Sequence, residues 1–326
     1  MKHSTRPIVV VGAGLAGLIA ARGIALSGRS VVVLDKGRSV GGRLATRRLG
    51  TANIDHGAQF FTVRSDAFSE FVGGLLADGL VYEWCQGFNE VDGFARFACR
   101  GGMNALARRL ASEVFAAGGG IQTGVQLSSV ARDADGWTLR WDAGNIEADA
   151  VLLTPPVPQS LALLDAGAVA LPTAMDAALR AISYHRVLAV LATLDRRSAI
   201  PEPGARQLLE GTFSFVADNQ RKAGDGPPSV TLHASHTVSG ERWDHDPQRL
   251  LADLLAEARP WLGDAAVLQA ELKKWRYSGP VTPYPEPCCQ AGTAEHPLLF
   301  AGDAFAGPKI EGAFLSGLAA AALLAS

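Results

Sequence analysis

The hydrophobic pattern of the chain starts with an apolar run, a glycine-rich turn and an amphipathic stretch. Residues 8–11 are continuously apolar, and a second apolar run over residues 31–34 ends at Asp35. A strand that is buried on both faces of a parallel sheet has such a continuous apolar run. The order along the chain therefore predicts strand, turn, helix, strand, and a carboxylate at the end of the second strand.

Later apolar patterns predict further elements of the fold. They are a helix over residues 107–117, strands over residues 121–130, 151–154, 229–235 and 298–301, a hairpin of residues 136–141 and 146–150, and a C-terminal helix from residue 310. Trp137 and Trp141 lie on one face of the hairpin, because strand side chains alternate with period two. Core packing is the favoured interpretation of both indoles.

Gly12, Gly14 and Gly17 have the spacing G-x-G-x-x-G at the end of the first predicted strand. In this context Gly12 permits a tight turn, Gly14 lets backbone N–H groups approach a pyrophosphate, and Gly17 lets the helix pack closely on the sheet. The helix start adds a positive dipole end for the phosphates. Asp35 follows 23 residues after Gly12, near the spacing of a carboxylate that binds an adenosine ribose. The segment predicts a dinucleotide-binding site.

Two further segments favour FAD over NAD as the dinucleotide. Gly42 and Arg43 follow shortly after Asp35 and predict a second backbone turn and a guanidinium near a diphosphate, with a solvated surface loop as the alternative. Near the other end, Gly302 and Asp303 stand between a predicted strand and the last helix. A carboxylate and a helix start suit a ribityl hydroxyl and a ring that gains negative charge on reduction. A cofactor contacted from both chain ends is long, as FAD is.

Several segments resemble the flavin-containing amine oxidase superfamily, and most closely its renalase-like branch, which includes bacterial renalases. The cofactor part of the resemblance lies in residues 1–60 and in the last 30 residues, with residues 55–62 and 302–317 as the most similar stretches. Shorter similar stretches are residues 101–106, 151–159, 232–235 and 275–277. The resemblance therefore spans the chain.

The glycine pattern and the resemblance together imply an α/β fold of two parts. A Rossmann-type FAD-binding domain, similar to those of glutathione reductase and amine oxidases, is expected over residues 1–80, 98–158 and 286–326. A second, α+β substrate-binding domain built on a mixed or antiparallel sheet is expected over residues 81–97 and 159–285.

The motifs and the resemblance also imply the FAD contacts. They are Gly12, Gly14, Ala16, Gly17, Asp35, Lys36, Gly42, Arg43, Ala58, Gln59, Phe60, Val125, Gly302, Asp303, Glu311, Gly312 and Ala313. The resemblance places residues 58–60 beside the isoalloxazine and Val125 near the adenine. Some relatives attach flavin covalently through a cysteine near residues 302–317, and this sequence has none there, so non-covalent FAD is expected.

Composition and charge exclude several classes of partner. The 326 residues are 48% hydrophobic and 19% charged, as in ordinary globular proteins. A net charge of −2 with interspersed signs predicts neither nucleic acid nor a membrane as a partner. The apolar start imitates a secretory signal, but the glycine motif explains it, and the apolar tail is shorter than the roughly 18 residues of a membrane span. We expect a cytoplasmic protein with reduced cysteines.

His233, Trp275 and Tyr277 are the candidate substrate-pocket residues. On predicted strands His233 shares a face with Thr231, and Trp275 shares a face with Tyr277. Aromatic rings suit the stacking of a planar substrate, whereas ordinary core or structural positions are the alternative for all three. His56, beside the residues expected at the flavin, either approaches the ring or faces solvent.

Neither a metal site nor a nucleophilic catalytic motif is expected. His233 and His236 would lie on opposite faces of one strand, so a single ion would not bind both. Ser, His and Asp residues are scattered along the chain, and no nucleophile elbow is expected. Flavin chemistry requires neither feature, because the cofactor accepts the hydride itself.

By resemblance, the expected activity is oxidation of isomeric dihydro-NAD(P) by hydride transfer to flavin N5, with oxygen as acceptor, giving NAD(P)⁺ and hydrogen peroxide. One alternative is oxidation of an amine or another small reduced substrate, with Lys274 as the candidate for the lysine that amine oxidases place near N5. A flavin-binding accessory protein without fast turnover is the other. The stretch after His233 lacks a tryptophan of several bacterial relatives, so the pocket is expected to differ from theirs. The sequence leaves the oligomeric state and the NAD or NADP preference open.

Overall fold

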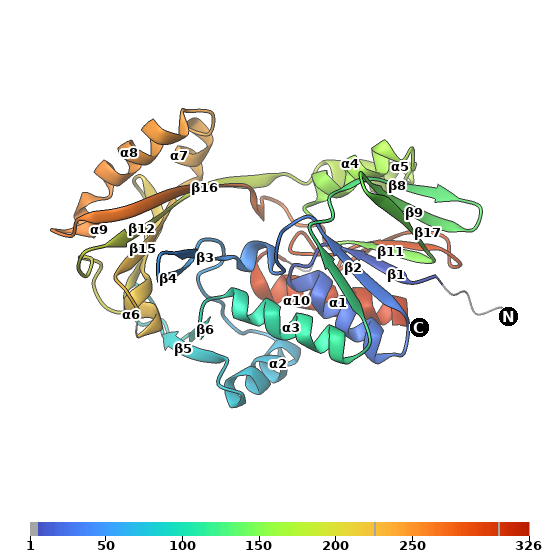
Figure 1. Cartoon of the computed structure of the whole chain (residues 1–326), viewed down its shortest axis with the longest axis horizontal. Helices are drawn as coiled ribbons and strands as arrows, with labels where there is room; N and C mark the ends of the chain where they lie inside the picture. Colours follow the sequence, from blue (N-terminus) through green and yellow to red (C-terminus); the bar gives the residue numbers. More distant parts are fainter. Residues whose placement is uncertain (1–5, 225, 306, 326) are drawn as a thin grey trace. The chain divides into compact units, whose positions relative to one another are not determined.

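The computed structural model describes residues 6–224, 226–305 and 307–325, and the chain divides into two compact units (Figure 1). Unit 1 consists of Met1–Gly42, Leu106–Ser183 and Gly279–Ser326, and unit 2 consists of Arg43–Ala105 and Tyr184–Ser278. Each unit has its own sheets, so the two are described in turn.

Unit 1 is built on a six-stranded sheet. Its strands in spatial order are β17 (Cys289–Gly292), β18 (Pro297–Phe300), β11 (Ala150–Leu153), β1 (Ile8–Val11), β2 (Val31–Asp35) and β7 (Gly120–Thr123). Neighbouring strands are parallel except β17 and β18, which are antiparallel. Every residue of β1 and β11 is buried, which explains their continuous apolar sequence. The predicted α/β class and the predicted order of strand, turn, helix and strand are confirmed.

Two helices from opposite ends of the chain pack against each other in unit 1. These are α1 (Leu15–Leu26), blue in Figure 1, and α10 (Lys309–Ala325), red. A Cβ atom at Gly317 would lie 2.5 Å from the carbonyl oxygen of Ala16, so the backbones touch where a larger residue would separate them. Within the described part of the chain, no helix, α10 included, has the length and hydropathy to cross a membrane.

A three-stranded antiparallel sheet and several helices also belong to unit 1. The strands in spatial order are β10 (Gly144–Ala148), β9 (Gly136–Trp141) and β8 (Leu127–Asp133), and the helices are most of α3 (Asn104–Ala116), with α4 (Val157–Ala166) and α5 (Thr173–Arg180). The predicted hairpin is present as β9 and β10, and Trp137 is 2% exposed in the core. The single strand predicted over residues 121–130 is wrong. Gly124, with a left-handed φ of 76°, separates β7 from β8.

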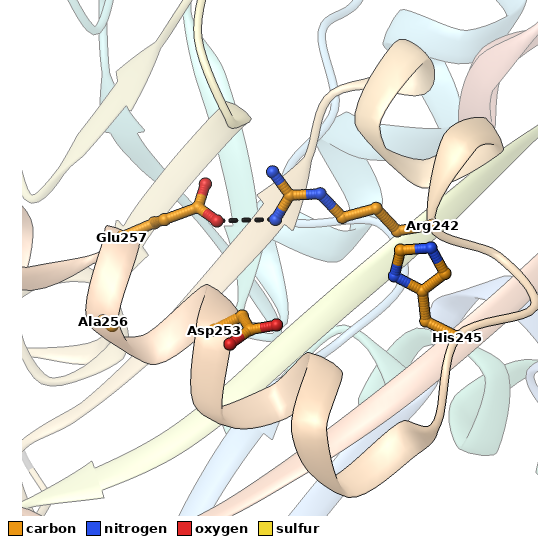
Figure 2. Close-up of a pocket in the computed structure, with 5 residues that line it drawn as sticks. All are labelled: Arg242, His245, Asp253, Ala256 and Glu257. Atoms are coloured by element: carbon orange, nitrogen blue, oxygen red, sulfur yellow. Dashed lines mark hydrogen bonds and ion pairs between the residues drawn. The ribbon is translucent and has the colours of Figure 1, made fainter.

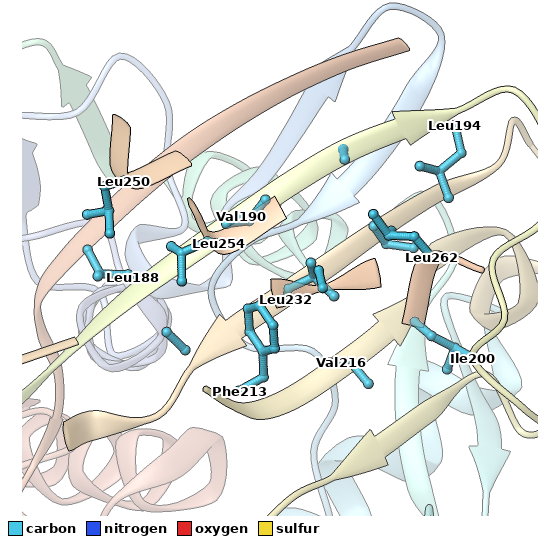
Figure 3. Close-up of a cluster of buried hydrophobic side chains, with 14 of the residues drawn as sticks. Leu188, Val190, Leu194, Ile200, Phe213, Val216, Leu232, Leu250, Leu254 and Leu262 are labelled. Atoms are coloured by element: carbon cyan, nitrogen blue, oxygen red, sulfur yellow. The ribbon is translucent and has the colours of Figure 1, made fainter. Parts of the chain in front are cut away.

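Unit 2 contains a five-stranded sheet with an apolar core. The strands in spatial order are β13 (Ala205–Gln207), β14 (Phe213–Asp218), β15 (Ser229–Ala234), β12 (Tyr184–Leu194) and β16 (Val267–Pro280). The pairs β13–β14, β14–β15 and β12–β15 are antiparallel, in agreement with the expected second sheet. Figure 3 shows its core, in which Leu188 and Leu232 from the strands meet Leu254 from α8 (Pro247–Glu257), all fully buried.

Two hairpins and short helices surround this sheet. The hairpins are β3 (Thr46–Leu49) with β4 (Ala52–Asp55) and β5 (Val81–Cys85) with β6 (Arg96–Cys99), and the helices are η1 (Gly42–Leu44), which starts in unit 1, α2 (Asp66–Ala77), α6 (Asn219–Ala223), α7 (His236–Glu241) and α9 (Arg259–Leu262). Ser235 is the N-cap of α7, where its side chain accepts a hydrogen bond from Val238 N. His236 is therefore the first residue of a helix, so the expectation that it lies on the same strand as His233 is wrong.

The two units divide the chain differently from the expected domains. Residues 43–80 and 98–105, expected with the FAD-binding part, lie in unit 2, and residues 159–183 and 279–285, expected with the substrate part, lie in unit 1. The reason is packing, because β4 contacts β15 in unit 2 and α4 contacts β8 in unit 1. Local sequence patterns do not contain these contacts.

Gly317→Ala should lower the thermal stability of the protein, because the added Cβ has to displace the backbone of α1 at Ala16. Overpacking of this kind costs about 1–3 kcal/mol. Gly73→Ala is the matched control, since Gly73 lies inside α2 and a Cβ there meets nothing within 4 Å. The control should gain about 0.5–1 kcal/mol. Thermal unfolding followed by circular dichroism measures both variants, and equal melting temperatures would contradict the close packing of α1 and α10.

Candidate functional site

The glycine turn after β1 is shaped by Thr154, which follows β11 in unit 1. Thr154 Oγ1 lies within donating distance of the carbonyl oxygens of Val11, at 2.8 Å, and Gly12, at 3.1 Å. A Cβ at Gly17 would lie 2.0 Å from the carbonyl oxygen of Gly12, so α1 starts in direct backbone contact with the turn. Sequence reasoning missed the role of Thr154, although a hydroxyl at the end of a buried strand was a usable signal.

The side of the turn at Gly14 is open. A Cβ at Gly14 would meet nothing within 4 Å, and no side chain caps α1 at this residue. A second turn lies beside it, because Gly41 N donates to Ala13 O at 2.8 Å and a Cβ at Gly42 would lie 3.5 Å from Gly14 Cα. Two closely spaced backbone turns next to an uncapped helix start suit the oxygens of a diphosphate. The residues present therefore fit a dinucleotide.

Asp35 at the end of β2 holds the glycine turn with its carboxylate. Its two oxygens accept hydrogen bonds from the backbone N–H groups of Ala13 and Gly37, each at 2.6 Å. A carboxylate has about four acceptor sites, so Asp35 keeps the capacity to bind ribose hydroxyls. The N–H of Val125 donates to the carbonyl oxygen of Asp35 at 2.9 Å. The structure thus brings Val125, predicted near the adenine, next to the predicted ribose ligand.

The strand end before α10 joins the same region of unit 1. A Cβ at Gly302 would lie 3.5 Å from the carbonyl oxygen of Thr154, and Gly302 N donates to the buried Ser316 Oγ at 2.8 Å. Asp303 follows directly and is 8% exposed. Ser316 was not predicted as a site residue. Its hydroxyl fixes the residue before the predicted ribityl ligand.

The other predicted contacts of unit 1 differ in exposure. Ala16 and Gly312 are buried, and Glu311 and Ala313, in the first part of α10, are half-buried. Lys36 is exposed, and its Nζ donates to Gln159 Oε1 at 3.1 Å. Lys36 therefore lies at the rim of this region.

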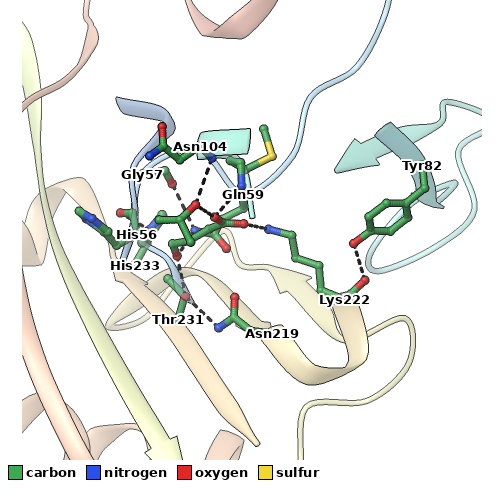
Figure 4. A network of polar contacts seen from close by, with 12 residues as sticks. His56, Gly57, Gln59, Tyr82, Asn104, Asn219, Lys222, Thr231 and His233 are labelled. Carbon is green, nitrogen blue, oxygen red and sulfur yellow. Dashed lines mark hydrogen bonds and ion pairs between the residues drawn. The ribbon is translucent and has the colours of Figure 1, made fainter. Parts of the chain in front are cut away.

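Asp55, at the end of β4, is the centre of a buried polar network in unit 2 (Figure 4). The donors to its carboxylate are Lys222 Nζ at 2.6 Å, Thr46 Oγ1 at 2.5 Å and Met103 N at 2.8 Å, and those to its carbonyl oxygen are Gln59 Nε2 at 2.6 Å and Thr231 Oγ1 at 2.8 Å. Asp55 is 3% exposed and Lys222 is 5% exposed. Sequence reasoning missed this ion pair, because neither residue belongs to a motif that predicts the other.

The turn after Asp55 carries three predicted flavin contacts, and Gln59 shapes it from inside. Gln59 is 4% exposed, and its Nε2 donates to the carbonyl oxygens of Asp55, at 2.6 Å, and Gly57, at 3.3 Å. Phe60 lies edge-on to Phe88, with ring centroids 4.8 Å apart. The side chain of Gln59 therefore holds the turn closed, and that of Phe60 packs in an aromatic cluster of unit 2.

Arg43 connects this turn to β16. Its Nη1 donates to the carbonyl oxygens of Tyr277, at 3.4 Å, and Ser278, at 3.3 Å. Its own carbonyl oxygen accepts from Ala58 N at 2.9 Å. The guanidinium predicted near a diphosphate is thus bound, within unit 2, to two backbone carbonyls of β16.

Trp275, His233 and His56 meet at one peptide group. The carbonyl oxygen of His56 accepts from Trp275 Nε1 at 2.7 Å and from His233 Nε2 at 3.2 Å. The His56 and Trp275 rings stack, with centroids 5.2 Å apart and planes 24° apart. Tyr277 instead lies edge-on to Tyr184, at 5.4 Å. Two of the three predicted pocket residues are thus brought together directly, with His56 as the third ring.

Both histidines of this group are neutral near pH 7. Burial lowers the pKa of His233 from 6.5 to about 4. Burial, followed by the positive charge of Lys273, lowers the pKa of His56 from 6.5 to about 4. The carbonyl of His56 only accepts hydrogen bonds, so the neutral His233 ring carries its proton on Nε2.

A surface hollow of about 360 Å³ lies beside α8 in unit 2 (Figure 2). It is lined by Arg242, His245, Asp253, Ala256 and Glu257, none of which was predicted as a site residue. Arg242 Nη1 pairs with Glu257 Oε1 at 2.6 Å, so these two charges neutralise each other. In residues 6–224, 226–305 and 307–325, no group of three His, Cys, Asp or Glu side chains is placed to hold a metal ion.

His233→Gln should weaken the loss of stability in acid. The folded-state pKa of His233, about 4, lies below the unfolded value, so below pH 6.5 the unfolded chain takes up a proton that the folded chain does not bind. Stability present above pH 6.5 is therefore lost as the pH falls towards 4, by up to about 3 kcal/mol for this residue. Urea unfolding at both ends of this range measures it, with the exposed His245→Gln as control. Identical pH dependence in wild type and His233→Gln would contradict the buried neutral ring.

Two family models match the sequence. The model of flavin containing amine oxidoreductases matches residues 66–325, and the model of NAD(P)-binding Rossmann-like domains matches residues 10–75. The second match covers the glycine turn and Asp35, and the first covers most of the chain. Together they agree with the fit of the glycine turns to a dinucleotide.

Solved structures show the same fold at low sequence identity. A protein from Exiguobacterium sp. 255-15, provisionally named a protoporphyrinogen oxidase, has a TM-score of 0.73 at 14% identity, with 98% of each chain covered. Putrescine oxidase with bound putrescine has a TM-score of 0.70 at 15% identity, over 97% of this chain and 98% of that one. Cyclohexylamine oxidase from Brevibacterium oxydans IH-35A has a TM-score of 0.68 at 14% identity, over 98% of each chain.

The family match confirms three expectations from the sequence. The cofactor is FAD, the protein is an FAD-dependent oxidase, and a Rossmann-type part is combined with a second, antiparallel sheet. The match covers residues 66–325, well over half of the sequence. The chain therefore belongs to the flavin-containing amine oxidoreductase family.

Proposed function

We propose that this enzyme is a renalase-like oxidase of isomeric dihydro-NAD(P), the forms reduced at an unusual ring position. Bound FAD would supply the hydride acceptor at N5 and the transfer of two electrons to oxygen, and in the balanced reaction dihydro-NAD(P), O₂ and a proton give NAD(P)⁺ and hydrogen peroxide. The task of the polypeptide is then to bind a flat, uncharged ring and to exclude water around it.

The uncharged aromatic wall of unit 2 carries this proposal. His56 and Trp275 stack at 5.2 Å, and His233 binds the same carbonyl oxygen as the indole. Because the pKa of each imidazole is about 4, the wall is neutral at physiological pH. Flat neutral rings favour stacking with a dihydronicotinamide, which is itself a neutral ring.

Two cations and two carboxylates act on His56. Arg47 Nη2 and Lys273 Nζ both bind Glu271, at 3.1 Å and 2.6 Å. Lys273 and Arg47 lower the pKa of His56, whereas Asp55 and Glu271 raise it. These opposed charges nearly balance, so the neutral aromatic rings, and not a local net charge, support the choice of substrate.

Oxidation of an amine is the second candidate function, because the family match supports that chemistry. The position of Lys274 counts against it. Strand side chains alternate, so Lys274 and Trp275 lie on opposite faces of β16. Lys274 Nζ donates to the carbonyl oxygen of Trp243 at 2.5 Å and lies 5.6 Å from the centroid of its ring. This ammonium is therefore held on the face of β16 that the His56–Trp275 wall does not occupy.

The proposed FAD contacts divide by chemistry. Gly14 and Gly42 leave room for the diphosphate, and Asp35 offers acceptors to the ribose. Asp303, before α10, is proposed for the ribityl chain. The turn of residues 56–60 is proposed for the isoalloxazine, as the resemblance implies. The other FAD contacts predicted from the sequence are proposed as well.

Anaerobic stopped-flow absorbance tests the proposed activity. The 2- and 6-dihydro isomers of NAD and NADP should bleach the oxidised flavin band rapidly, and ordinary NADH should not. Putrescine and cyclohexylamine serve as amine donors in parallel. A flavin that stays oxidised with every isomer and is reduced by an amine would replace the proposal with amine oxidation. Reduction by none of these donors would favour an accessory role.

His233→Ala and Trp275→Phe should slow flavin reduction about tenfold or more while FAD remains bound, because both remove a hydrogen bond that fixes the His56 carbonyl. Pre-steady-state reduction rates and flavin content measure the two effects separately. His245→Ala, on the surface of the same unit, is the control. Unchanged reduction kinetics in His233→Ala would leave that histidine with a structural role.

Gly14→Val should fold and lose FAD. The φ of Gly14 is −78°, which valine adopts, and an added Cβ meets nothing within 4 Å, so the backbone is not strained. The side chain would instead fill the space proposed for the diphosphate. Flavin absorbance per protein and the far-ultraviolet circular dichroism spectrum measure cofactor and fold. A folded Gly14→Val protein that keeps stoichiometric flavin would refute this assignment.

A further inference from the structure

We propose that the buried ion pair of Asp55 and Lys222 is a positioning device that fixes the turn of residues 56–60 for the reaction. This inference rests on the proposed contact between that turn and the isoalloxazine. The pair touches neither substrate nor cofactor in this proposal. It acts through the peptide groups that follow Asp55.

Hydrogen bonds hold both the side chain and the main chain of Asp55 in one orientation. Its carboxylate is bound by Lys222 Nζ at 2.6 Å, by a hydroxyl from β3 and by a backbone N–H before α3, while its carbonyl oxygen is bound by Gln59 Nε2 and Thr231 Oγ1. Side chain and main chain of one residue are thus anchored to three elements of unit 2, β3, α6 and β15, and to two residues outside helices and strands. The backbone direction at which the turn leaves β4 is fixed by these bonds (Figure 4).

The partner of Asp55 is itself held firmly. Lys222 lies on α6, whose N-cap Asp218 accepts a hydrogen bond from Arg221 N at 2.9 Å. The carbonyl oxygen of Lys222 accepts from Tyr82 Oη at 2.6 Å, and its Nζ lies 5.4 Å from the ring centroid of Trp84. An ammonium fixed in this way transmits the position of α6 to Asp55.

Two consecutive carbonyl groups of the turn are bound by the same strand. Thr231 Oγ1 donates to the carbonyl oxygen of Asp55 at 2.8 Å, and His233 Nε2 donates to that of His56 at 3.2 Å. Thr231 and His233 share a face of β15 because strand side chains alternate. Without Lys222, the carboxylate of Asp55 would be a buried charge without its counter-ion and would turn towards water. The orientation of the next peptide groups would change with it.

Stability alone is a weak reason for such a pair. Replacing a buried ion pair with apolar residues of similar size is often neutral or stabilising, whereas removing one partner is destabilising. A pair kept only for stability is therefore replaceable as a unit. A pair that sets the direction of a turn is not, because two uncharged side chains do not reproduce its directional bonds.

Three variants separate a positioning role from a purely stabilising one. They are the single variants Lys222→Met and Lys222→Arg and the double variant Asp55→Asn/Lys222→Met. Arg221→Met is the matched control, since Arg221 directly precedes Lys222 on α6 and pairs with Glu202 instead of Asp55. Melting temperature, FAD content, the visible flavin spectrum, its midpoint potential and the rate of flavin reduction are measured on each holoenzyme.

The double variant should recover much of the melting temperature that Lys222→Met loses, yet keep a flavin spectrum and midpoint potential shifted from wild type. Its flavin reduction should be about 10- to 100-fold slower, with Lys222→Arg between it and wild type. Arg221→Met, which removes the pairing with Glu202 and Asp218, should leave the flavin spectrum, the midpoint potential and the rate of flavin reduction unchanged. A double variant with wild-type spectrum, potential and reduction rate would overturn the proposal. The flavin spectrum and the midpoint potential are measured without substrate. They therefore test the positioning role of the ion pair even if the dihydro-NAD(P) isomers fail to reduce the wild-type enzyme.

Discussion

Backbone contacts that leave no room for a Cβ atom determine how unit 1 is assembled. Gly17 lies against the carbonyl of Gly12, and Gly317 lies against that of Ala16, so both α10 and the glycine turn approach α1 at the same end. Larger residues at these places would push the three segments apart. The turn is open at Gly14, where a Cβ would meet nothing within 4 Å, as the proposed diphosphate contact requires. Close packing in unit 1 and the proposed cofactor contact therefore both depend on positions that carry no side chain.

Unit 2 is organised around a buried charge instead. Burial removes the solvation of the Asp55 and Lys222 charges, and the hydrogen bonds to the carboxylate, together with the ion pair, offset that loss. An apolar core such as that around Leu232 does not by itself fix the direction of a backbone segment, because dispersion contacts are not directional. Hydrogen bonds to a carboxylate are directional, so they fix the backbone position at Asp55 from which the turn of residues 56–60 starts.

The sequence alone predicts the helices and strands whose signal lies within a few neighbouring residues. The apolar runs and glycine spacing predicted β1, α1, β2 and the acid at its end, and the tail predicted α10, because burial on both faces and helix starts leave patterns within a few residues. The ion pair of Asp55 and Lys222 has no such pattern, since its partners are distant in the chain and ordinary in composition. Strand 121–130 was mispredicted because the left-handed turn at Gly124 interrupts an otherwise continuous pattern. The unit boundaries depend on tertiary contacts of β4 and α4, which no local pattern contains.

The assembly of unit 1 from segments far apart in the chain also governs the order of its folding. β1 pairs with β11, β11 pairs with β18, and α1 packs on α10, so its central contacts join the first and last parts of the chain. Closing such long loops is slow, and the contacts of β18 and α10 cannot form before those elements have been synthesised. Unit 2, whose longer segment is continuous from β12 to β16, does not wait for α10. The bonds that hold the glycine turn to Asp35 and Thr154 lie within residues 8–154, so the packing of α10 on α1 is the contact of unit 1 that waits for residues 309–325.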